Sequence, residues 1–509
     1  MKRLILSAAL LAAAGSYAQN EIDALRYSQE ELYGTARYRA MSGAFGALGG
    51  DFSGFSINPA GSSVFANGAI ALTLGGHTTK SNASFFNNGT STESSDLNAD
   101  QIGTVFVFKD GNPGAKFNKF SIGINYQRTR NYEDNLLAYS GTNTNASIAD
   151  YFGSMAAGFQ LGDLRLRSGE SISSAYREIG INGGYAMQQA FLGYQGWLIE
   201  PDTDNDSEIA YHSNALLPVN QQYRQETYGG DYKFTTNFSF LYNNTFHLGA
   251  NLNFHRVAYR QFTRTIENAT DTSPASRLQN ANFRNELQTN GEGVSLQIGG
   301  IYKVTDELRL GLAYQSPTWY RLNDETVQSL SSQAYDDNGV LQSYSLNPNI
   351  VNLYDDYRLS TPSEWTASLA YVFGKRGLIS VDYQYKNYAN MKYRTKNAEQ
   401  FVSTNEVIRN TFGESNVVRI GGEFKALPAL SLRAGYRFES SPYKNNALMG
   451  DLNGYSLGLG YDFGGFAIDV AYNRSKRDWQ HQMYDTGLTD RAQINSTWSN
   501  FVVTAIFKL

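Results

Sequence analysis

The chain of 509 residues contains no cysteine. Disulfide bonds, thiolate metal ligands, a cysteine nucleophile and a lipoprotein anchor cysteine are therefore all excluded. Charge is also scarce, because only 17% of the residues are charged and the formal net charge is −5. That balance lacks the basic footprint of proteins that bind nucleic acid. We expect no nucleic-acid partner and no cofactor.

Motifs for catalysis and for metal binding are missing as well. An enzyme of the hydrolase type would need a histidine with a serine or carboxylate partner. None of the five histidines stands in a recognisable motif; they are His77, His212, His247, His255 and His481. The sequence has no nucleophile motif and no metal-ligand spacing. We therefore expect no catalytic residue, no metal site and no enzymatic activity.

Long hydrophobic runs are absent after the first 18 residues, since no later stretch approaches the ~18 apolar residues of a membrane helix. The N-terminus has Lys2 and Arg3, an apolar core Leu4–Ala14 and the small-residue pattern Ser16–Ala18. This order predicts a signal peptide, residues 1–18, whose removal leaves Gln19 first. A membrane anchor is the alternative, but the apolar run is too short for it.

What the chain does contain is alternation of apolar and polar residues, with 35 Tyr, 29 Phe and 48 Gly. Two alternating stretches near the C-terminus are separated only by Gly464 and Gly465, which is typical of a tight hairpin. The same pattern predicts about 14 strands: Gly68–Gly76, Ile102–Phe108, Lys119–Gln127, Phe234–Tyr242, His247–Arg256, Val294–Tyr302, Leu308–Gln315, Glu364–Phe373, Leu378–Tyr385, Asn416–Phe424, Leu430–Phe438, Tyr455–Phe463, Phe466–Asn473 and Ser499–Lys508.

The connections between these strands alternate between long and short. The short ones include Asn243–Phe246, Gly374–Gly377 and Gly464–Gly465, whereas the connection Arg128–Lys233 is very long. Bacterial outer-membrane barrels have an even number of strands, short periplasmic turns and long extracellular loops. The alternation therefore predicts such a barrel, with both ends of the chain on the periplasmic side.

The two faces of the strands agree with this interpretation. One face is apolar, with residues such as Ile124, Leu312 and Val381. The other is polar, and its candidate lumen residues are Arg309, Arg419, Arg433, Arg437, Asp462 and Asp469. A soluble barrel would turn its apolar face inward, but about 14 strands enclose a lumen too wide for apolar side chains to fill. We predict an all-β transmembrane antiparallel β-barrel over residues 68–509.

Residues 19–67 precede the first strand and hold the turn Asn58, Pro59, Ala60 and Gly61. Pro59 fixes one φ angle and Gly61 tolerates strained ones, so this turn can be rigid without a helix or a sheet. A barrel whose ends are periplasmic can fold such a segment into its lumen. The segment is therefore predicted to be a hatch that meets the lumen charges, and the alternative is a loose periplasmic tail.

At this point the sequence resembles the FadL/TodX-type outer-membrane transporters of hydrophobic compounds. The resemblance lies in Gly43–Asp51 and Ile57–Gly61, "GAFGALGGD" and "INPAG", shortly after the signal peptide. The form with Arg37–Arg39 ahead of the turn is similar to the Bacteroidetes branch, which includes haemin receptors and accessory subunits of export machinery. The resemblance implies a 14-stranded barrel plugged by an N-terminal hatch, and passive uptake of long-chain fatty acids or similar hydrophobic molecules.

The long loop Arg128–Lys233 supplies a candidate extracellular groove for such a solute. Two segments of the loop have large apolar residues at helical spacing: Phe152, Met155, Phe159, Phe191, Leu192 and Trp197. Helices with these faces can also simply cap the mouth of the barrel, because both arrangements bury the same apolar face. The sequence leaves groove and cap open.

Three functions remain open at this stage. The first is a channel for a hydrophobic solute, with membrane lipid and that solute as its partners. The second is a barrel that carries no solute, either as a subunit that binds other outer-membrane proteins or as a receptor for haemin or another ligand. The third, an enzyme in the barrel wall, has no motif to support it. In each case the location is the outer membrane.

Overall fold

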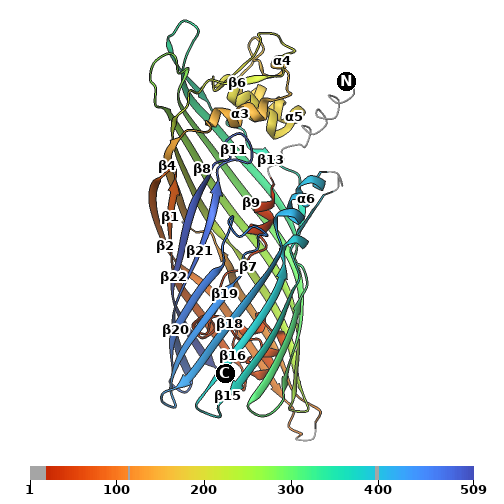
Figure 1. Cartoon of the computed structure of the whole chain (residues 1–509). Helices are drawn as coiled ribbons and strands as arrows, with labels where there is room; N and C mark the ends of the chain where they lie inside the picture. The colour runs from red at the N-terminus through yellow and green to blue at the C-terminus, as the bar shows by residue number, and fades with distance from the viewer. Residues whose placement is uncertain (1–18, 113–114, 134, 396–399) are drawn as a thin grey trace, which may run out of the picture.

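The structure is a computed structural model of the whole chain, and it describes residues 19–112, 115–133, 135–395 and 400–509. The predicted signal peptide, residues 1–18, lies outside the described residues. The described chain forms a tall barrel with helices gathered above one side of its upper end (Figure 1). None of the described helices is both long and apolar enough to cross a membrane.

Within the described residues, fourteen antiparallel strands follow one another around the wall. They are β1 (Ala69–Phe85), β2 (Asn88–Lys109), β3 (Phe117–Asn131), β7 (Val219–Tyr242), β8 (Phe246–Ala269), β9 (Leu278–Lys303), β10 (Leu308–Gln315), β15 (Glu364–Val372), β16 (Gly377–Asn387), β18 (Glu414–Lys425), β19 (Leu430–Glu439), β20 (Leu452–Asp462), β21 (Phe466–Gln482) and β22 (Arg491–Lys508). The last strand pairs with the first from Ala69–Lys508 to Ser84–Gln493. This closure confirms the predicted fold class.

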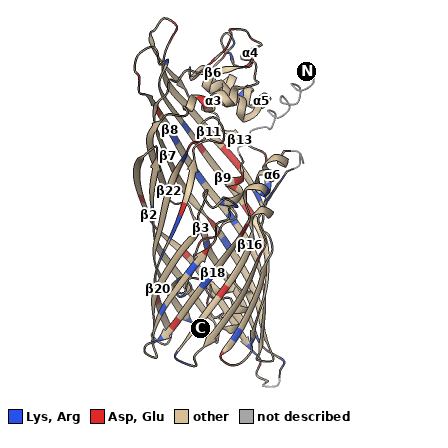
Figure 2. Cartoon of the chain, in the orientation of Figure 1, with Lys and Arg blue, Asp and Glu red and all other residues tan. Residues whose placement is uncertain are grey.

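The faces of the wall alternate as predicted. In β8, for example, Leu248 and Phe254 point outward and are 46% and 46% exposed, whereas Asn251 and Asn253 point inward and are buried. Charged residues occur along the strands as well as at their ends (Figure 2). Because an outer-membrane barrel presents apolar side chains to lipid and polar ones to its lumen, the exposed apolar face is the lipid-facing face.

Several strands run much further toward the extracellular end than the sequence pattern indicated. β7 begins at Val219 and β9 at Leu278, each 15 or more residues ahead of its predicted start. These extensions stand above the membrane, where neither face needs to be apolar, so alternation cannot mark them. Further strands complete the upper wall and loops: β4 (Asn135–Asn143), β5 (Ile199–Pro201), β6 (Tyr211–Ser213), β11 (Trp319–Tyr335), β12 (Leu341–Leu346), β13 (Asn352–Leu353), β14 (Tyr357–Ser360) and β17 (Lys392–Arg394).

Helices of the loops lie above the wall. They are α3 (Ile148–Ala156), α4 (Leu161–Leu164) and α5 (Ile172–Gln195), with α6 (Val402–Thr411) at another side of the mouth (Figure 1). The 3₁₀ turn η3 (Tyr388–Asn390) packs against α6. Asn20, Ser147 and Ser171 accept bonds from backbone N–H groups at the starts of α1, α3 and α5, which fixes where these helices begin.

Residues 19–67 form the hatch inside the barrel, with α1 (Glu21–Arg26), α2 (Ala36–Ala40), η1 (Gly54–Ser56) and η2 (Pro59–Val64). The hatch runs from the upper lumen, where the side-chain amide of Gln19 donates to Asp324 of β11 at 2.6 Å, down to the start of β1. The expectation that both ends are periplasmic is therefore wrong for the described N-terminal end. The physical reason is the apolar side of α1, where Ala24 and Leu25 pack in an aromatic cluster of the upper barrel.

Candidate solute chamber and hatch

The apolar residues of the long loop are packed into a cap. Phe152, Phe191 and Leu192 are 0% exposed, and they form one core with barrel residues such as Phe283. They therefore do not line an open groove. Of the other predicted groove residues, Met155, Phe159 and Trp197 are half-buried against the same core. Close packing of these side chains favours the cap, because a closed core buries more apolar area than a groove.

A large chamber lies between the cap and the hatch, with a volume of about 770 Å³. This volume is toward the upper part of the ~300–1,000 Å³ range of sites that enclose small ligands. Aromatic side chains from α3, β7, β9, β21 and the loop after β21 line it: Tyr151, Tyr223, Phe283, Trp479, His481 and Tyr484. Tyr151 and Tyr484 have ring centroids 4.2 Å apart, and Tyr223 and His481 have centroids 4.9 Å apart.

The chamber is apolar and aromatic under the cap and polar at the hatch. Its lower lining includes hatch residues Gln29–Tyr33 and the ion-paired side chains of Arg437 and Glu439. At its upper end, burial raises the pKa of the carboxyl groups of Glu21 and Asp485. Higher pKa values make these groups easier to neutralise, which lowers the cost of bringing an apolar solute next to them.

The predicted turn at Asn58 lies deep in the lumen and holds the hatch to the barrel. The side-chain amide of Asn58 donates to the carbonyl oxygens of Gly46 and Gly300 at 2.7 and 3.0 Å, and its oxygen accepts from the N–H of Ala60 at 3.2 Å. Pro59 is the first residue of η2, where its missing N–H costs nothing. Gly61 lies against Gly49 of the hatch, where a Cβ would come within 3.1 Å of the Gly49 Cα.

A row of inward amide side chains on β7, β8 and β9 binds the carbonyl groups of the hatch. Asn237 donates to the carbonyl of Pro59 and Asn251 to that of Phe55, both at 2.8 Å. Gln297 donates to the carbonyls of Ser56 and Ile57 at 3.0 Å each. Short 3₁₀ turns leave such carbonyls without partners of their own, so the row satisfies them and fixes the position of the turn.

The predicted lumen charges lie at different depths. Arg309 donates to the hatch carbonyl of Leu48 at 3.1 Å. Arg433 binds Glu423 at 2.7 Å and Asp469 at 2.6 Å, and Glu423 also binds hatch residue Arg37 at 2.9 Å. These groups are therefore brought together around the hatch.

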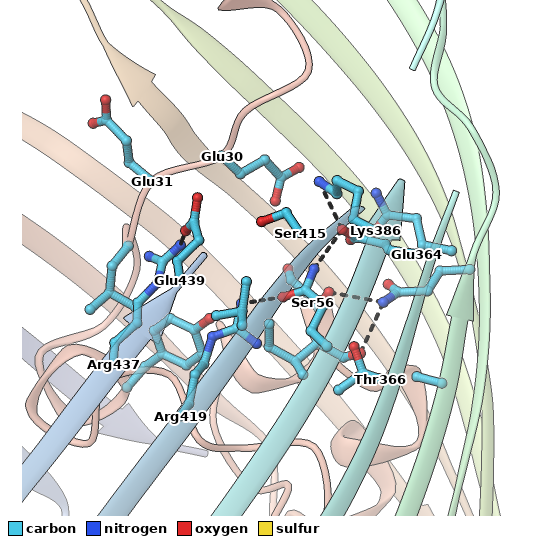
Figure 3. A pocket seen from close by; sticks show the side chains of 18 of the residues that line it. Glu30, Glu31, Ser56, Glu364, Thr366, Lys386, Ser415, Arg419, Arg437 and Glu439 are labelled. Atoms are coloured by element: carbon cyan, nitrogen blue, oxygen red, sulfur yellow. Dashed lines mark hydrogen bonds and ion pairs between the residues drawn. The ribbon is translucent and has the colours of Figure 1, made fainter. Parts of the chain in front are cut away.

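Asp462 is not among them, although it is on the inward face of β20. Its side chain is 43% exposed beside the turn 463–465 and pairs with Lys508 at 2.7 Å. Arg419 and Arg437 face a smaller polar pocket at the hatch, which Figure 3 shows together with Glu364, Lys386 and Glu439.

The hatch also holds the wall at a place where two strands part. Asp100 is the extra residue of a β-bulge in β2, and its carboxylate lies 2.9 Å from both hatch residue Arg39 and His77. The ladder between β2 and β3 extends upward only to the pair Gln101–Gln127. In the described residues above that pair, the two strands are bridged by side chains.

Side-chain hydrogen bonds bridge this seam. The amide of Asn131 donates to Asp96 at 3.0 Å, and Arg128 donates to Asn98 at 3.0 Å. Asn131 also lines the chamber. The chamber thus reaches the barrel wall where no backbone ladder closes it.

Comparison with known proteins agrees with this architecture. The profile of a family described as "Outer membrane protein transport protein (OMPP1/FadL/TodX)" matches residues 231–507, which is more than half of the chain. The chain belongs to this family. The resemblance to FadL/TodX-type transporters is confirmed, and the OMPP1/FadL/TodX family consists of outer-membrane β-barrels that are transport proteins. The Bacteroidetes branch stays a prediction.

Solved structures of this OMPP1/FadL/TodX family share the fold at low sequence identity. A FadL homologue from Pseudomonas aeruginosa has a TM-score of 0.54 and 14% identity, over 94% of this chain and 99% of that one. The toluene transporter TodX from Pseudomonas putida has a TM-score of 0.50 and 15% identity, over 95% of this chain and 100% of that one. No curated protein matches the sequence.

Sequence reasoning missed the chamber residues and the hatch anchors. The spacing of the two rings Trp479 and His481 in β21 was a usable signal, although apolar and polar residues do not alternate there, because a strand that continues above the membrane keeps turning every second residue inward. Asp100 gave no such signal, since a bulge breaks the alternation at that residue.

Proposed function

We propose that this protein is a passive outer-membrane channel for the uptake of hydrophobic molecules, such as long-chain fatty acids or molecules similar to them. The observation that carries the proposal is the aromatic-lined chamber of about 770 Å³ inside a membrane-spanning barrel. Burial of apolar solute surface there is favourable by ~25 cal/mol per Å² and needs no energy source. Membrane lipid and the solute are the proposed partners.

The proposed pathway begins at the cap and leads into the chamber. Below the chamber, residues 19–67 act as the hatch that blocks the axial route, because their carbonyls and charges are bonded to the barrel at many points. The solute leaves through the seam between β2 and β3 into the outer leaflet of the membrane. This route keeps an apolar molecule out of water, which an axial route would not.

Other observations agree with this proposal. The solved structure of TodX is described as a toluene transporter, so a barrel of this fold carries a hydrophobic solute in that case. The proposed signal peptide, residues 1–18, provides export to the membrane. We propose no catalytic role, since the family consists of transport proteins.

Native mass spectrometry of the protein extracted from its own membrane tests the proposal. We expect an apolar molecule to be retained by the wild-type protein and to be retained less by Ser475→Trp, because Ser475 lines the chamber and a large ring there takes up part of its space. Lys476→Trp is the matched control, since Lys476 is the next residue of β21 and is exposed on the opposite face. Its bound molecule should be retained.

The same measurement separates the alternatives. A stoichiometric protein partner together with an empty chamber would support the function as a subunit of a larger assembly and would contradict the function as a channel. A bound haemin in place of an apolar solute would support a receptor.

A further inference from the structure

One inward carboxylate holds the middle of the hatch. Asp382 of β16 is 0% exposed, and one of its oxygens accepts the backbone N–H groups of Phe45 and Gly46, both at 2.9 Å. Hydrogen bonds to an ionised carboxylate are about twice as strong as neutral ones. This single side chain is therefore a principal attachment of the hatch to the wall.

The residue directly across from it on the next strand is a cation with which it forms no hydrogen bond and no ion pair in the described residues. Arg419 of β18 is in register with Asp382, yet no ion pair to Arg419 is present among the described residues. Arg419 donates through one terminal nitrogen to Gln384, whereas its Nε and its other terminal nitrogen have no hydrogen-bond partner in the described part of the chain. The side chain is 6% exposed and faces the polar pocket (Figure 3).

Every other carboxylate around that pocket is already paired with a different cation. Arg437 lies across from Arg419 on its other side and is bound to a carboxylate of its own. The pairs are Glu439 with Arg437 and Arg477, Glu364 with Lys386, Glu30 with Lys233, and Glu31 with Arg130. A buried guanidinium that forms no direct ion pair is costly, so Arg419 can accept a carboxylate that becomes free.

We propose that Asp382 exchanges partners when the hatch moves. With the hatch seated, Asp382 holds the N–H groups of Phe45 and Gly46. When this segment lifts, Asp382 pairs with Arg419 across the strands, where side chains directly opposite have Cβ atoms about 4.5–5.5 Å apart. Arg419 is thus a positioning residue that stabilises the lifted state. This inference goes beyond the proposed function, in which the solute leaves through the seam and the hatch stays in place.

A purely structural role for Arg419 predicts the opposite change in how often the hatch lifts when Arg419 is removed. If Arg419 only supports the charge of the seated Asp382, its removal weakens the seated state. If Arg419 receives Asp382 after lifting, its removal weakens the lifted state and the hatch opens less often. The direction of the change therefore decides between the two roles.

Hydrogen exchange of the hatch peptide 43–48, followed by mass spectrometry of the full-length protein in lipid vesicles, measures this lifting. In Arg419→Met we expect exchange of the Phe45 and Gly46 amides to slow by about tenfold, the size of one charged hydrogen bond. In Asp382→Asn we expect exchange to accelerate. Combined with Asp382→Asn, Arg419→Met should have no further effect on hydrogen exchange, because the carboxylate that would pair with Arg419 is gone.

Two further variants complete the test. Arg437→Met removes a cation that already has its own partner and should leave exchange of this peptide unchanged, and Arg419→Lys should retain wild-type exchange. Migration of the unheated protein on gels verifies that each barrel is folded. Faster or unchanged exchange in folded Arg419→Met overturns the proposal. The outcome does not depend on any solute, so a failure here is distinct from a failure of the channel proposal.

Discussion

Asn58→Ala is the most informative change in the hatch, because this one side chain makes three hydrogen bonds, two from its amide and one to its oxygen. At about 0.5–1.5 kcal/mol for each bond, the loss is roughly 2–4 kcal/mol for the seated turn. The bonds to Gly46 and Ala60 hold the turn within the hatch, and the bond to Gly300 attaches it to the barrel wall. Since 1.4 kcal/mol corresponds to a factor of ten, the population of barrels with an unseated turn should rise by roughly 30- to 1,000-fold. The fourteen wall strands do not depend on Asn58, so the barrel itself should stay folded.

Conductance of the purified variant in planar lipid bilayers reports this change. We expect frequent openings to small ions in Asn58→Ala and rare ones in the wild type. Asn338→Ala removes the same type of side chain from an exposed turn and should behave as the wild type. Equal conductance of Asn58→Ala and Asn338→Ala, with equal hydrogen exchange in the turn, would refute the assignment of Asn58 as an anchor of the hatch.

Three other changes test the wall and the seam. Val470→Arg places a charge on the lipid-facing side of β21 and should cost roughly 2–4 kcal/mol in urea unfolding from vesicles; a neutral result would contradict the assignment of the outer face. Gly435→Val should displace the hatch and raise leak conductance, since a Cβ there would lie 2.5 Å from the carbonyl carbon of Met41, and an unchanged leak would show that the hatch does not need this close approach. Asp96→Cys with Asn131→Cys, joined by a short thiol-reactive crosslinker, should stop uptake of a fatty acid probe in this cysteine-free protein, and undiminished uptake after crosslinking would exclude the seam as the exit.

The membrane-spanning part of the barrel could be predicted from the sequence, because lipid requires every second side chain to be apolar. Leu457 and Leu459 carry that signal plainly in β20. The upper wall could not be predicted in the same way, since water on both sides imposes no alternation. β11, with buried Asp324 and Gln328, shows the consequence.

The functional site could be predicted from the sequence less completely than the fold. The motif at Asn58 indicated the hatch, because an Asn-Pro turn has few conformations. The partners of the hatch could not be predicted, since Asp382 and Gln297 become its hydrogen-bond partners only when the barrel closes around it. The same holds for Asp469, which the pattern placed in the lumen without revealing its ion pair with Arg433.

The central claim, that the chamber carries hydrophobic molecules passively, is tested most directly by uptake of radiolabelled oleate into vesicles that contain only this protein and no energy source. We expect uptake to be faster than in protein-free vesicles, to be slowed in Ser475→Trp and to be retained in Lys476→Trp. Uptake by folded Ser475→Trp equal to that of the wild type would contradict the claim that the solute passes through this chamber.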